Sequence, residues 1–255
     1  MSDLLDLSGR VALVTGGSRG LGKEMCLAFA EHGASVVVAS RKADACHALA
    51  AEITETTGQR AIGVACHVGH WDECDTLVDT VYDVFGRCDV LVNNAGMSPL
   101  YPDLPSVSED LFDKVIGVNL KGPFRLSALI GTRMQEGEGG SIINVSSTAS
   151  VSPTSNELTY GAAKAGLNAL TLGLARSFGP TVRANGIMPG PFLTDISKAW
   201  DLEAFAERAR TSIPLERGGQ PGEIVGAALY LASDASSYTT GAIIKIDGGS
   251  AYTPG

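Results

Sequence analysis

The chain has 255 residues, of which 44% are hydrophobic and 18% are charged, and this balance predicts one large folded domain rather than disorder. Its formal net charge of −9 argues against binding to nucleic acid or to an anionic membrane surface, because both need basic patches. No apolar stretch approaches the roughly 20 residues that cross a bilayer, and the N-terminus carries acids where a signal peptide carries basic residues. We therefore expect a cytoplasmic protein.

Cysteine and histidine form no metal-binding or disulfide pattern. The five cysteines are odd in number and scattered, without a C-x-x-C pair, so we expect reduced thiols in or near the core. His67 and His70 lie three residues apart, but no third ligand accompanies them in the sequence, so no metal site is expected.

Short apolar runs alternate with longer helical patterns through the first half of the chain. We expect strands within residues 10–15, 35–40, 61–67 and 88–96 and helices within 22–33, 43–58 and 71–86. Each helical pattern ends on a glycine, the usual residue after a helix, at Gly33, Gly58 and Gly86. The strands are nearly continuous apolar runs, as in a parallel sheet buried on both faces, so right-handed βαβ units in a doubly wound α/β sheet are predicted.

The same alternation continues through the second half. Helical patterns cover 108–134, 155–179 and 221–233, and strands are expected within 140–147, 181–188 and 241–249. No repeat or linker interrupts the pattern, so we expect a single domain over residues 1–255. Residues 189–221 are the least regular part, and we expect a loop with one or two short helices there, a candidate lid over a site.

The glycine-rich stretch TGGSRGLGK at 15–23 follows the first predicted strand and fits two nucleotide-binding motifs. The order G-x-x-x-x-G-K at 17–23 matches a mononucleotide phosphate loop, whereas T-G-x-x-x-G-x-G at 15–22 matches a dinucleotide loop. Glu24 stands where the phosphate loop needs Ser or Thr to hold Mg²⁺, which favours the dinucleotide. The glycines then let the backbone approach a pyrophosphate, and the start of the following helix attracts its charge.

The residues after the second predicted strand bear on which dinucleotide binds. NAD-binding proteins usually place an acid there for the ribose 2′-hydroxyl, whereas NADP-binding proteins place Arg nearby. This chain has Ser40, Arg41 and Lys42 and no acid, and Arg19 in the glycine loop adds a further cation. A serine with several cations suits a 2′-phosphate, so NADP(H) is preferred; if these cations form only a solvated helix start, NAD(H) is the alternative.

Tyr160 and Lys164 are four residues apart, so they share one face of the helix predicted there. Thr154 and Glu157 fit a capping box that would begin this helix just before Tyr160. A free tyrosine has a pKa of about 10, and a nearby lysine cation, aided by the positive helix start and a bound nicotinamide, favours tyrosinate. Such a tyrosine can exchange a proton with a substrate hydroxyl or carbonyl oxygen.

These motifs, taken with others along the chain, resemble the short-chain dehydrogenase/reductase family. They are TGGSRGLG at 15–22, NNAG at 93–96, VNLKG around Asn119, INVSS at 143–147, YGAAK at 160–164, MPGPFLT at 188–194 and IDGG at 246–249. The resemblance covers nearly the whole chain and includes acyl-carrier-protein ketoreductases and gluconate-type sugar dehydrogenases. It implies a single Rossmann-type domain with a seven-stranded parallel sheet, assembled as a homotetramer or dimer.

The resemblance implies a catalytic set at matching positions of this sequence. Tyr160 would be the general acid/base, and Lys164 would lower its pKa and hold the nicotinamide ribose. Ser147 would hydrogen-bond the substrate oxygen, with Ser146 as the alternative, and Asn119 would anchor a proton-relay water.

The role of Asn119 also has support in the residues themselves. Pro123 has no N–H, so the carbonyl of Asn119, four residues earlier, loses its helical donor and can accept from a water. Asn119 could equally mark a purely structural kink, and both roles are compatible.

The resemblance further implies the residues that hold the cofactor. These are Gly16, Ser18, Arg19 and Leu21 in the phosphate and ribose loop, Asn94 beside the cofactor, the Val68 backbone, Tyr160 and Lys164, and Phe192 and Thr194 over the carboxamide and pyrophosphate. Many relatives have Asp-Val after the third strand, where the Asp contacts the adenine amine. This chain has His67-Val68, so the contact of that side chain is not carried over.

The predicted function is hydride transfer between NADP(H) and a carbonyl or secondary alcohol of a small molecule, with Tyr160 as general acid/base. The alternative is a catalytically silent nucleotide-sensing or scaffolding homologue, against which Ser147, Tyr160 and Lys164 argue. A serine hydrolase is excluded, because the chain lacks G-x-S-x-G and has no histidine beyond residue 70.

The candidate lid bears on the substrate. Its apolar side chains are Phe192, Leu193, Ile196, Trp200, Leu202 and Phe205. Such a lining would suit a hydrophobic ketone or an acyl chain, but the same residues could simply pack the lid itself.

Overall fold

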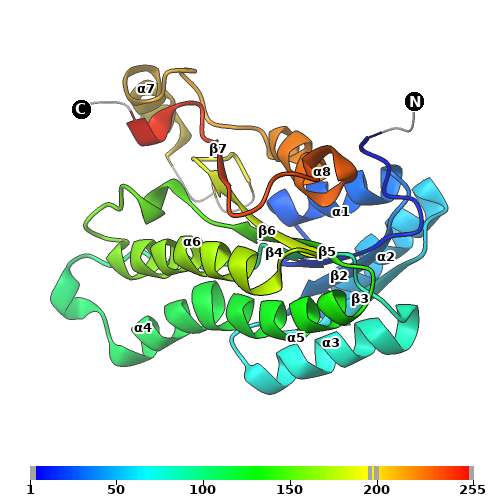
Figure 1. Ribbon diagram of the computed structural model, residues 1–255. Helices are drawn as coiled ribbons and strands as arrows, with labels where there is room; N and C mark the ends of the chain where they lie inside the picture. Colours follow the sequence, from blue (N-terminus) through cyan, green and yellow to red (C-terminus); the bar gives the residue numbers. More distant parts are fainter. Residues whose placement is uncertain (1–3, 195–196, 198–200, 253–255) are drawn as a thin grey trace.

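The computed structural model describes residues 4–194, 197 and 201–252, and its centre is a parallel sheet (Figure 1). The seven strands are β1 (Val11–Thr15), β2 (Ser35–Ser40), β3 (Ala61–Ala65), β4 (Val90–Asn93), β5 (Gly140–Val145), β6 (Val182–Pro189) and β7 (Ile243–Ile246). They lie in the order β3-β2-β1-β4-β5-β6-β7, and every pair is parallel. The predicted doubly wound parallel sheet is therefore confirmed.

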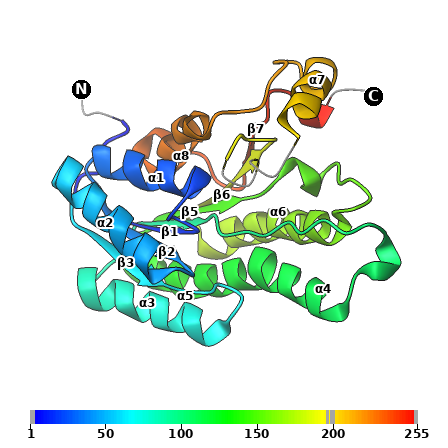
Figure 2. The same cartoon turned by 180° about the vertical axis from the view of Figure 1, so that it is seen from behind.

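The helices cover both faces of this sheet (Figure 2). They are α1 (Gly20–Glu31), α2 (Ala43–Thr57), α3 (Trp71–Phe85), α4 (Glu109–Ile116), α5 (Gly122–Glu136), α6 (Leu158–Phe178), α7 (Leu202–Ser212) and α8 (Val225–Ala232). Alternate strand residues serve the two faces, so on β1 Ala12 and Val14 join one apolar core while Val11 and Leu13 join the other. The first core includes α1, α2 and α8, and the second includes α3, α5 and α6.

The helix ends follow the predicted glycine punctuation. Gly58 and Gly86 adopt left-handed backbone angles directly after α2 and α3, with φ of 73° and 72°. Each donates its N–H to the carbonyl four residues earlier, Thr54 and Tyr82, which ends the helix. A side chain with a Cβ would be strained in this conformation, so these positions favour glycine.

The helical stretch predicted over 108–134 contains a change of helix type. α4 is followed by a π-helical turn, η2 (Gly117–Lys121), and then by α5. The Gly122 N–H donates five residues back to the Gly117 carbonyl, and Pro123 has no N–H to restore the α pattern. A Cβ on Gly122 would overlap the carbonyl of Val68, so the turn lies directly against the loop after β3.

The described residues of 189–221 include a partly separate unit around α7, which Figure 1 shows apart from the helices that cover the sheet. Phe205, Ala209 and Ile213 form a small apolar cluster with Leu193, distinct from the two main cores. The two ends of the unit are joined by backbone hydrogen bonds from Leu193 to Gly219 (2.8 Å) and from Gly219 to Pro191 (3.0 Å). The predicted short helix is thus present, while Ile196 and Trp200 lie outside the described residues.

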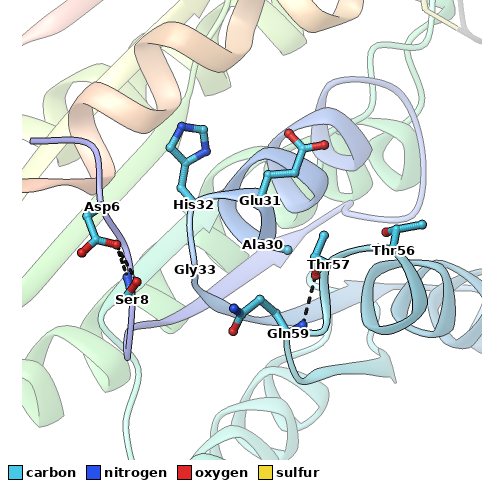
Figure 3. Close-up of a pocket in the computed structure, with 9 residues that line it drawn as sticks. All are labelled: Asp6, Ser8, Ala30, Glu31, His32, Gly33, Thr56, Thr57 and Gln59. Atoms are coloured by element: carbon cyan, nitrogen blue, oxygen red, sulfur yellow. Dashed lines mark hydrogen bonds between the residues drawn. The ribbon is translucent and has the colours of Figure 1, made fainter. Parts of the chain in front are cut away.

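A cavity of about 560 Å³ lies at the edge of the sheet where β1, β2 and β3 begin (Figure 3). It is lined by Asp6, Ser8, Ala30, Glu31, His32, Gly33, Thr56, Thr57 and Gln59. The Asp6 carboxylate accepts from the Ser8 backbone and hydroxyl, and Thr57 accepts from the Gln59 N–H. These polar groups serve the local turns.

None of the described helices is long and apolar enough to span a membrane.

The close approach at Gly122 makes a stability prediction. We expect Gly122→Ala to lower the free energy of unfolding by about 2 kcal/mol, because the added Cβ meets the Val68 backbone rather than a movable side chain. Gly173→Ala in α6 is the matched control, since no atom lies near its Cβ, and it should stabilise by about 0.5–1 kcal/mol. Urea unfolding followed by circular dichroism measures both; equal stabilities would contradict the packing argument.

Candidate active site

The sheet brings the candidate residues of the sequence analysis to one edge. In a parallel sheet all strands end on the same side, and ligands bind there, where neighbouring strands send the chain in opposite directions. Here that point lies between β1 and β4. The residues just beyond or at these strand ends are Gly16, Ser18, Arg19 and Leu21 after β1, Ser40 and Arg41 at β2, Val68 after β3, Asn94 after β4, Ser147 after β5, and Phe192 and Thr194 after β6.

Thr15 and Asn94 tie the glycine loop to the loop after β4. The Thr15 hydroxyl accepts from the backbone N–H groups of Asn94 and Ala95, both at 3.1 Å, and donates to the Val92 carbonyl. The Asn94 side-chain amide donates to the carbonyls of Thr15 (2.9 Å) and Gly16 (3.2 Å). The structure thus uses the Asn94 side chain to hold the glycine loop in place.

The start of α1 is open to an anion. No side chain among the described residues caps this end of the helix, and its first turn contains no acid. Its backbone N–H groups therefore have the free donors and the positive dipole end that bind phosphate groups. A Cβ on Gly22 would come within 2.6 Å of the Asn94 amide nitrogen, so only a glycine permits this tight loop. These features fit a pyrophosphate.

Unpaired cations gather near the end of β2. The Ser18 and Ser40 hydroxyls lie 2.8 Å apart, which joins the glycine loop to this strand end. Arg19 and Arg41 are exposed, and neither forms an ion pair within the described part of the chain. By contrast, Lys23 is paired with a carboxylate of α2 at 3.0 Å. The site therefore has two guanidinium groups free for a bound anion.

Lys164, Asn119 and Gly96 meet at the other half of the site. Lys164 is 2% exposed, and its ammonium group donates to the Val145 carbonyl at 2.7 Å. A Cβ on Gly96 would lie 3.0 Å from Asn119 Oδ1 and 3.7 Å from Lys164 Nζ. Glycine at position 96 thus keeps open a gap between these two side chains. The Lys164 ammonium also lies 5.7 Å from the centre of the Tyr160 ring.

The Asn119 side chain is fully buried within the π-helical turn η2. Its amide nitrogen donates to the carbonyls of Met97 (2.8 Å) and Val115 (2.9 Å), and its oxygen accepts from the Met97 N–H (3.3 Å). The two contacts with Met97 hold the loop that follows NNAG, and the contact with Val115 ties the turn to the end of α4. Pro123 leaves no N–H for the Asn119 carbonyl in the α-helical pattern, so the backbone oxygen is the group suited to a water.

The two serines after β5 have different surroundings. Ser146 is buried, and its hydroxyl donates to the Lys164 carbonyl at 3.5 Å. Ser147 is half-buried and hydrogen-bonded to the Tyr160 side chain, while its oxygen accepts from the Ala149 N–H at 3.1 Å. Ser147 is therefore the serine placed beside Tyr160.

Burial changes the pKa of both Tyr160 and Lys164. Burial raises the pKa of Tyr160, the nearby Glu157 carboxylate adds to this, and the hydrogen bond with Ser147 offsets part of it. Burial lowers the pKa of Lys164 to about 7. The expectation that a lysine cation and a bound nicotinamide together favour tyrosinate stays a prediction.

The helix that carries Tyr160 and Lys164 begins just before Tyr160, as expected, at Leu158, but its N-cap is Glu157 and not Thr154. The Glu157 carboxylate accepts from the Thr154 N–H at 3.1 Å, which is one half of the box. The other half differs, because the Thr154 hydroxyl bonds to Asn156 at 2.7 Å instead of the helix backbone.

Sequence reasoning missed a buried polar row beneath the site. Asn93 donates to Ser127 (3.0 Å) and Asn144 (2.9 Å), and Asn144 donates to Thr171 (2.9 Å), so β4, β5, α5 and α6 are joined. Asn93 and Asn144 face each other in the sheet register. An asparagine inside each of two apolar strands was the available signal, since buried amides need partners.

The residues of the candidate lid mostly serve its own packing. Phe192 is 7% exposed and packs in a main core, while Leu193 and Phe205 pack in the separate cluster of α7. Leu202 is exposed. Thr194 lies beside the glycine loop, because a Cβ added to Gly20 would lie 3.6 Å from the Cβ of Thr194.

The cysteines are free and buried at all five positions, as expected. Among the described residues, no group of three or more His, Cys, Asp or Glu side chains is arranged to hold a metal ion.

Comparison with known proteins identifies the family. Residues 16–251 match a family model described as enoyl-(acyl carrier protein) reductase. The chain is 38% identical over 249 residues to a short chain dehydrogenase/reductase, astE, of Aspergillus oryzae, covering 95% of each chain. It belongs to the short-chain dehydrogenase/reductase family and is an NAD(P)-dependent oxidoreductase acting on alcohol or carbonyl groups.

Solved structures agree with this assignment. A short-chain type dehydrogenase/reductase from Mycobacterium marinum superposes with a TM-score of 0.91 at 35% identity, covering 98% of this chain and 99% of that one. A 7α-hydroxysteroid dehydrogenase complexed with NADH and 7-oxo glycochenodeoxycholic acid superposes with a TM-score of 0.92 at 34% identity, covering 98% and 97%.

The burial of Lys164 predicts a pH-dependent stability. Its pKa is about 7 when folded against the usual 10.5, so between these values the unfolded chain binds more protons and stability rises with pH. We expect Lys164→Met to be more stable than the parent at pH 7. The difference between their free energies of unfolding should shrink by about 2 kcal/mol by pH 9. Urea unfolding at the two pH values measures it.

Lys114→Met supplies the control for this experiment. Lys114 is exposed and pairs with Asp110 at 2.7 Å, so its replacement should shift stability equally at both pH values. A Lys164→Met gap that is constant from pH 7 to pH 9 would contradict a discharged Lys164.

Proposed function

We propose that this chain transfers a hydride between NADP(H) and a small-molecule carbonyl or secondary alcohol, with Tyr160 as the general acid/base. The observation that carries the proposal is the convergence of Tyr160, Ser147 and Lys164 at the strand ends opposite the open start of α1. A proton donor, a hydrogen-bonding hydroxyl and a buried amine then lie on one side of a dinucleotide site.

The chain has residues suited to holding each part of the cofactor. Gly16, Ser18 and Leu21 would hold the pyrophosphate with the backbone of α1, while Phe192 and Thr194 would face the nicotinamide half. Lys164 would hold the nicotinamide ribose. When bound, the nicotinamide supplies or accepts the hydride, and the protein supplies orientation and the proton.

The proton path uses the chain's own groups. The raised pKa of Tyr160 keeps its phenol protonated near neutral pH, which suits donation to a carbonyl oxygen during reduction. Ser147, already bonded to that phenol, would hold the same substrate oxygen. Lys164, with a pKa of about 7, can take and release a proton at its amine, and a water on the Asn119 carbonyl would continue the path.

The preference for NADP(H) over NAD(H) rests on the end of β2. The free guanidinium groups of Arg19 and Arg41, together with the joined Ser18 and Ser40 hydroxyls, suit a 2′-phosphate. The residues directly after β2, Arg41 and Lys42, include no acid to bond a free 2′-hydroxyl.

Two further expectations belong to this proposal. Residues 189–221 would act as a lid over the substrate, because their own apolar cluster and joined ends let them move as one unit. The chain would assemble as a homotetramer or dimer, as the family resemblance implies, which light scattering can measure.

The catalytic assignment predicts the behaviour of Tyr160→Phe. With a substrate found by screening ketones and secondary alcohols, we expect turnover to fall by at least about 100-fold, the usual contribution of a general acid or base. The Kd for NADPH should stay within about threefold of the parent, because the ring remains. Tyr230→Phe is the control, because Tyr230 lies on α8, away from the site, where its hydroxyl bonds Thr239. This variant should retain full turnover. Full turnover in Tyr160→Phe would overturn the assignment.

The cofactor assignment predicts the behaviour of Arg41→Ala. Loss of a charge-assisted contact should raise the Kd for NADPH about 10- to 100-fold, while the Kd for NADH changes little. Lys23→Ala is the control, because Lys23 is already paired with Glu52 and should leave both constants unchanged. Nicotinamide fluorescence titration measures them. Equal effects of Arg41→Ala on both dinucleotides would show that Arg41 does not read the 2′-phosphate.

A further inference from the structure

The strand order places the base of the dinucleotide beside the end of β3, an inference that rests on the proposed function. The pyrophosphate belongs at the start of α1 and the adenosine ribose at the end of β2, so the base, attached to that ribose, extends toward the next strand. The Cys66 N–H donates to the Ser40 carbonyl at 2.9 Å, so the chain leaving β3 lies directly beside the ribose position. The next residues, His67 and Val68, therefore flank the base.

The His67 ring is held by its neighbours in the loop after β3. Its Nδ1 accepts a hydrogen bond from the Gly69 N–H at 3.2 Å. The ring stacks on His70 with centroids 4.3 Å apart and planes 17° apart. The His67 backbone N–H donates to the Glu73 carboxylate at 2.7 Å, and the same carboxylate bonds the His70 ring at 2.6 Å. Within the part of the chain that the structure describes, His67 Nε2 has no partner.

Gly69 is required for this arrangement. A Cβ at position 69 would lie 2.9 Å from His67 Cε1 and 3.1 Å from Nδ1, closer than side chains pack. The missing Cβ lets the imidazole lie over the Gly69 backbone, where Nδ1 can reach the N–H.

The contact at Nδ1 decides what His67 offers a ligand. A nitrogen that accepts a hydrogen bond carries no proton, so the neutral ring carries its proton on Nε2. His67 therefore presents a donor and no acceptor. On the edge of the base that carries N7, adenine presents an acceptor at N7 and a donor at its 6-amino group, whereas a 6-oxopurine presents acceptors at both N7 and the 6-oxygen.

We infer that His67 makes the base site of this protein tolerant of 6-oxopurine dinucleotides. Its Nε2–H donates to N7 when the base is adenine and to N7 or the adjacent 6-oxygen when the base is hypoxanthine. Since Nε2 cannot accept from the 6-amino group, the His67 side chain has no contact that selects adenine. An acceptor side chain at the same position would select for the amine and repel the 6-oxygen.

The test compares reduced nicotinamide adenine dinucleotides with their hypoxanthine analogues, with and without the 2′-phosphate. Nicotinamide fluorescence titration gives the ratio of the Kd for the hypoxanthine form to the Kd for the adenine form. We expect a ratio within about threefold of one for the parent chain and at least tenfold higher for His67→Asp. His67→Glu is a second acceptor variant that carries the test if His67→Asp fails to fold.

His70→Gln is the matched control, because His70 lies in the same loop and stacks on His67 but offers no atom to the base in this account. Its ratio should equal that of the parent. A parent ratio above ten, or a ratio in the acceptor variants within threefold of the parent, would overturn the role of His67 while leaving the dinucleotide function standing. Failure of all four dinucleotides to bind would overturn the proposed function and this inference together.

Discussion

The hydrogen bonds between Thr15 and Asn94 are the constraint on which the site depends. They join the loops that leave β1 and β4, the adjacent strands from which the chain turns in opposite directions. One loop leads to the open start of α1, and the other leads through Gly96 to Asn119 and the Lys164 ammonium. A single pair of side chains thereby sets the spacing between the start of α1 and the residues around Lys164.

The π-helical turn η2 joins the same two halves at a greater depth. Its Asn119 holds the loop after β4, while Gly122, at its end, packs against the carbonyl of Val68 in the loop after β3. Gly117 and Val118 also approach Gly69 in that loop. The loops after β3 and β4 therefore both contact one element, and a shift of either would be felt by the other.

The fold, and with it the gathering of the candidate site residues at one edge of the sheet, was predictable because it depends on local patterns. Continuous apolar runs give buried parallel strands, glycines such as Gly58 and Gly86 end the helices, and the four-residue spacing of Tyr160 and Lys164 puts them on one face. The π turn and the ionisation of Tyr160 and Lys164 were not predictable in the same way. Both depend on how closely other segments approach, and no spacing within the sequence encodes that depth of burial.

The separate packing of α7 has a consequence for how this protein can diversify. Because Phe205, Ala209 and Ile213 bury one another rather than entering the cores of the sheet, residues in this unit can change size without disturbing strand packing. The backbone bonds at Pro191, Leu193 and Gly219 keep both ends of the unit anchored while its interior varies. Substitutions that alter the shape of α7 would therefore have little effect on the stability of the sheet.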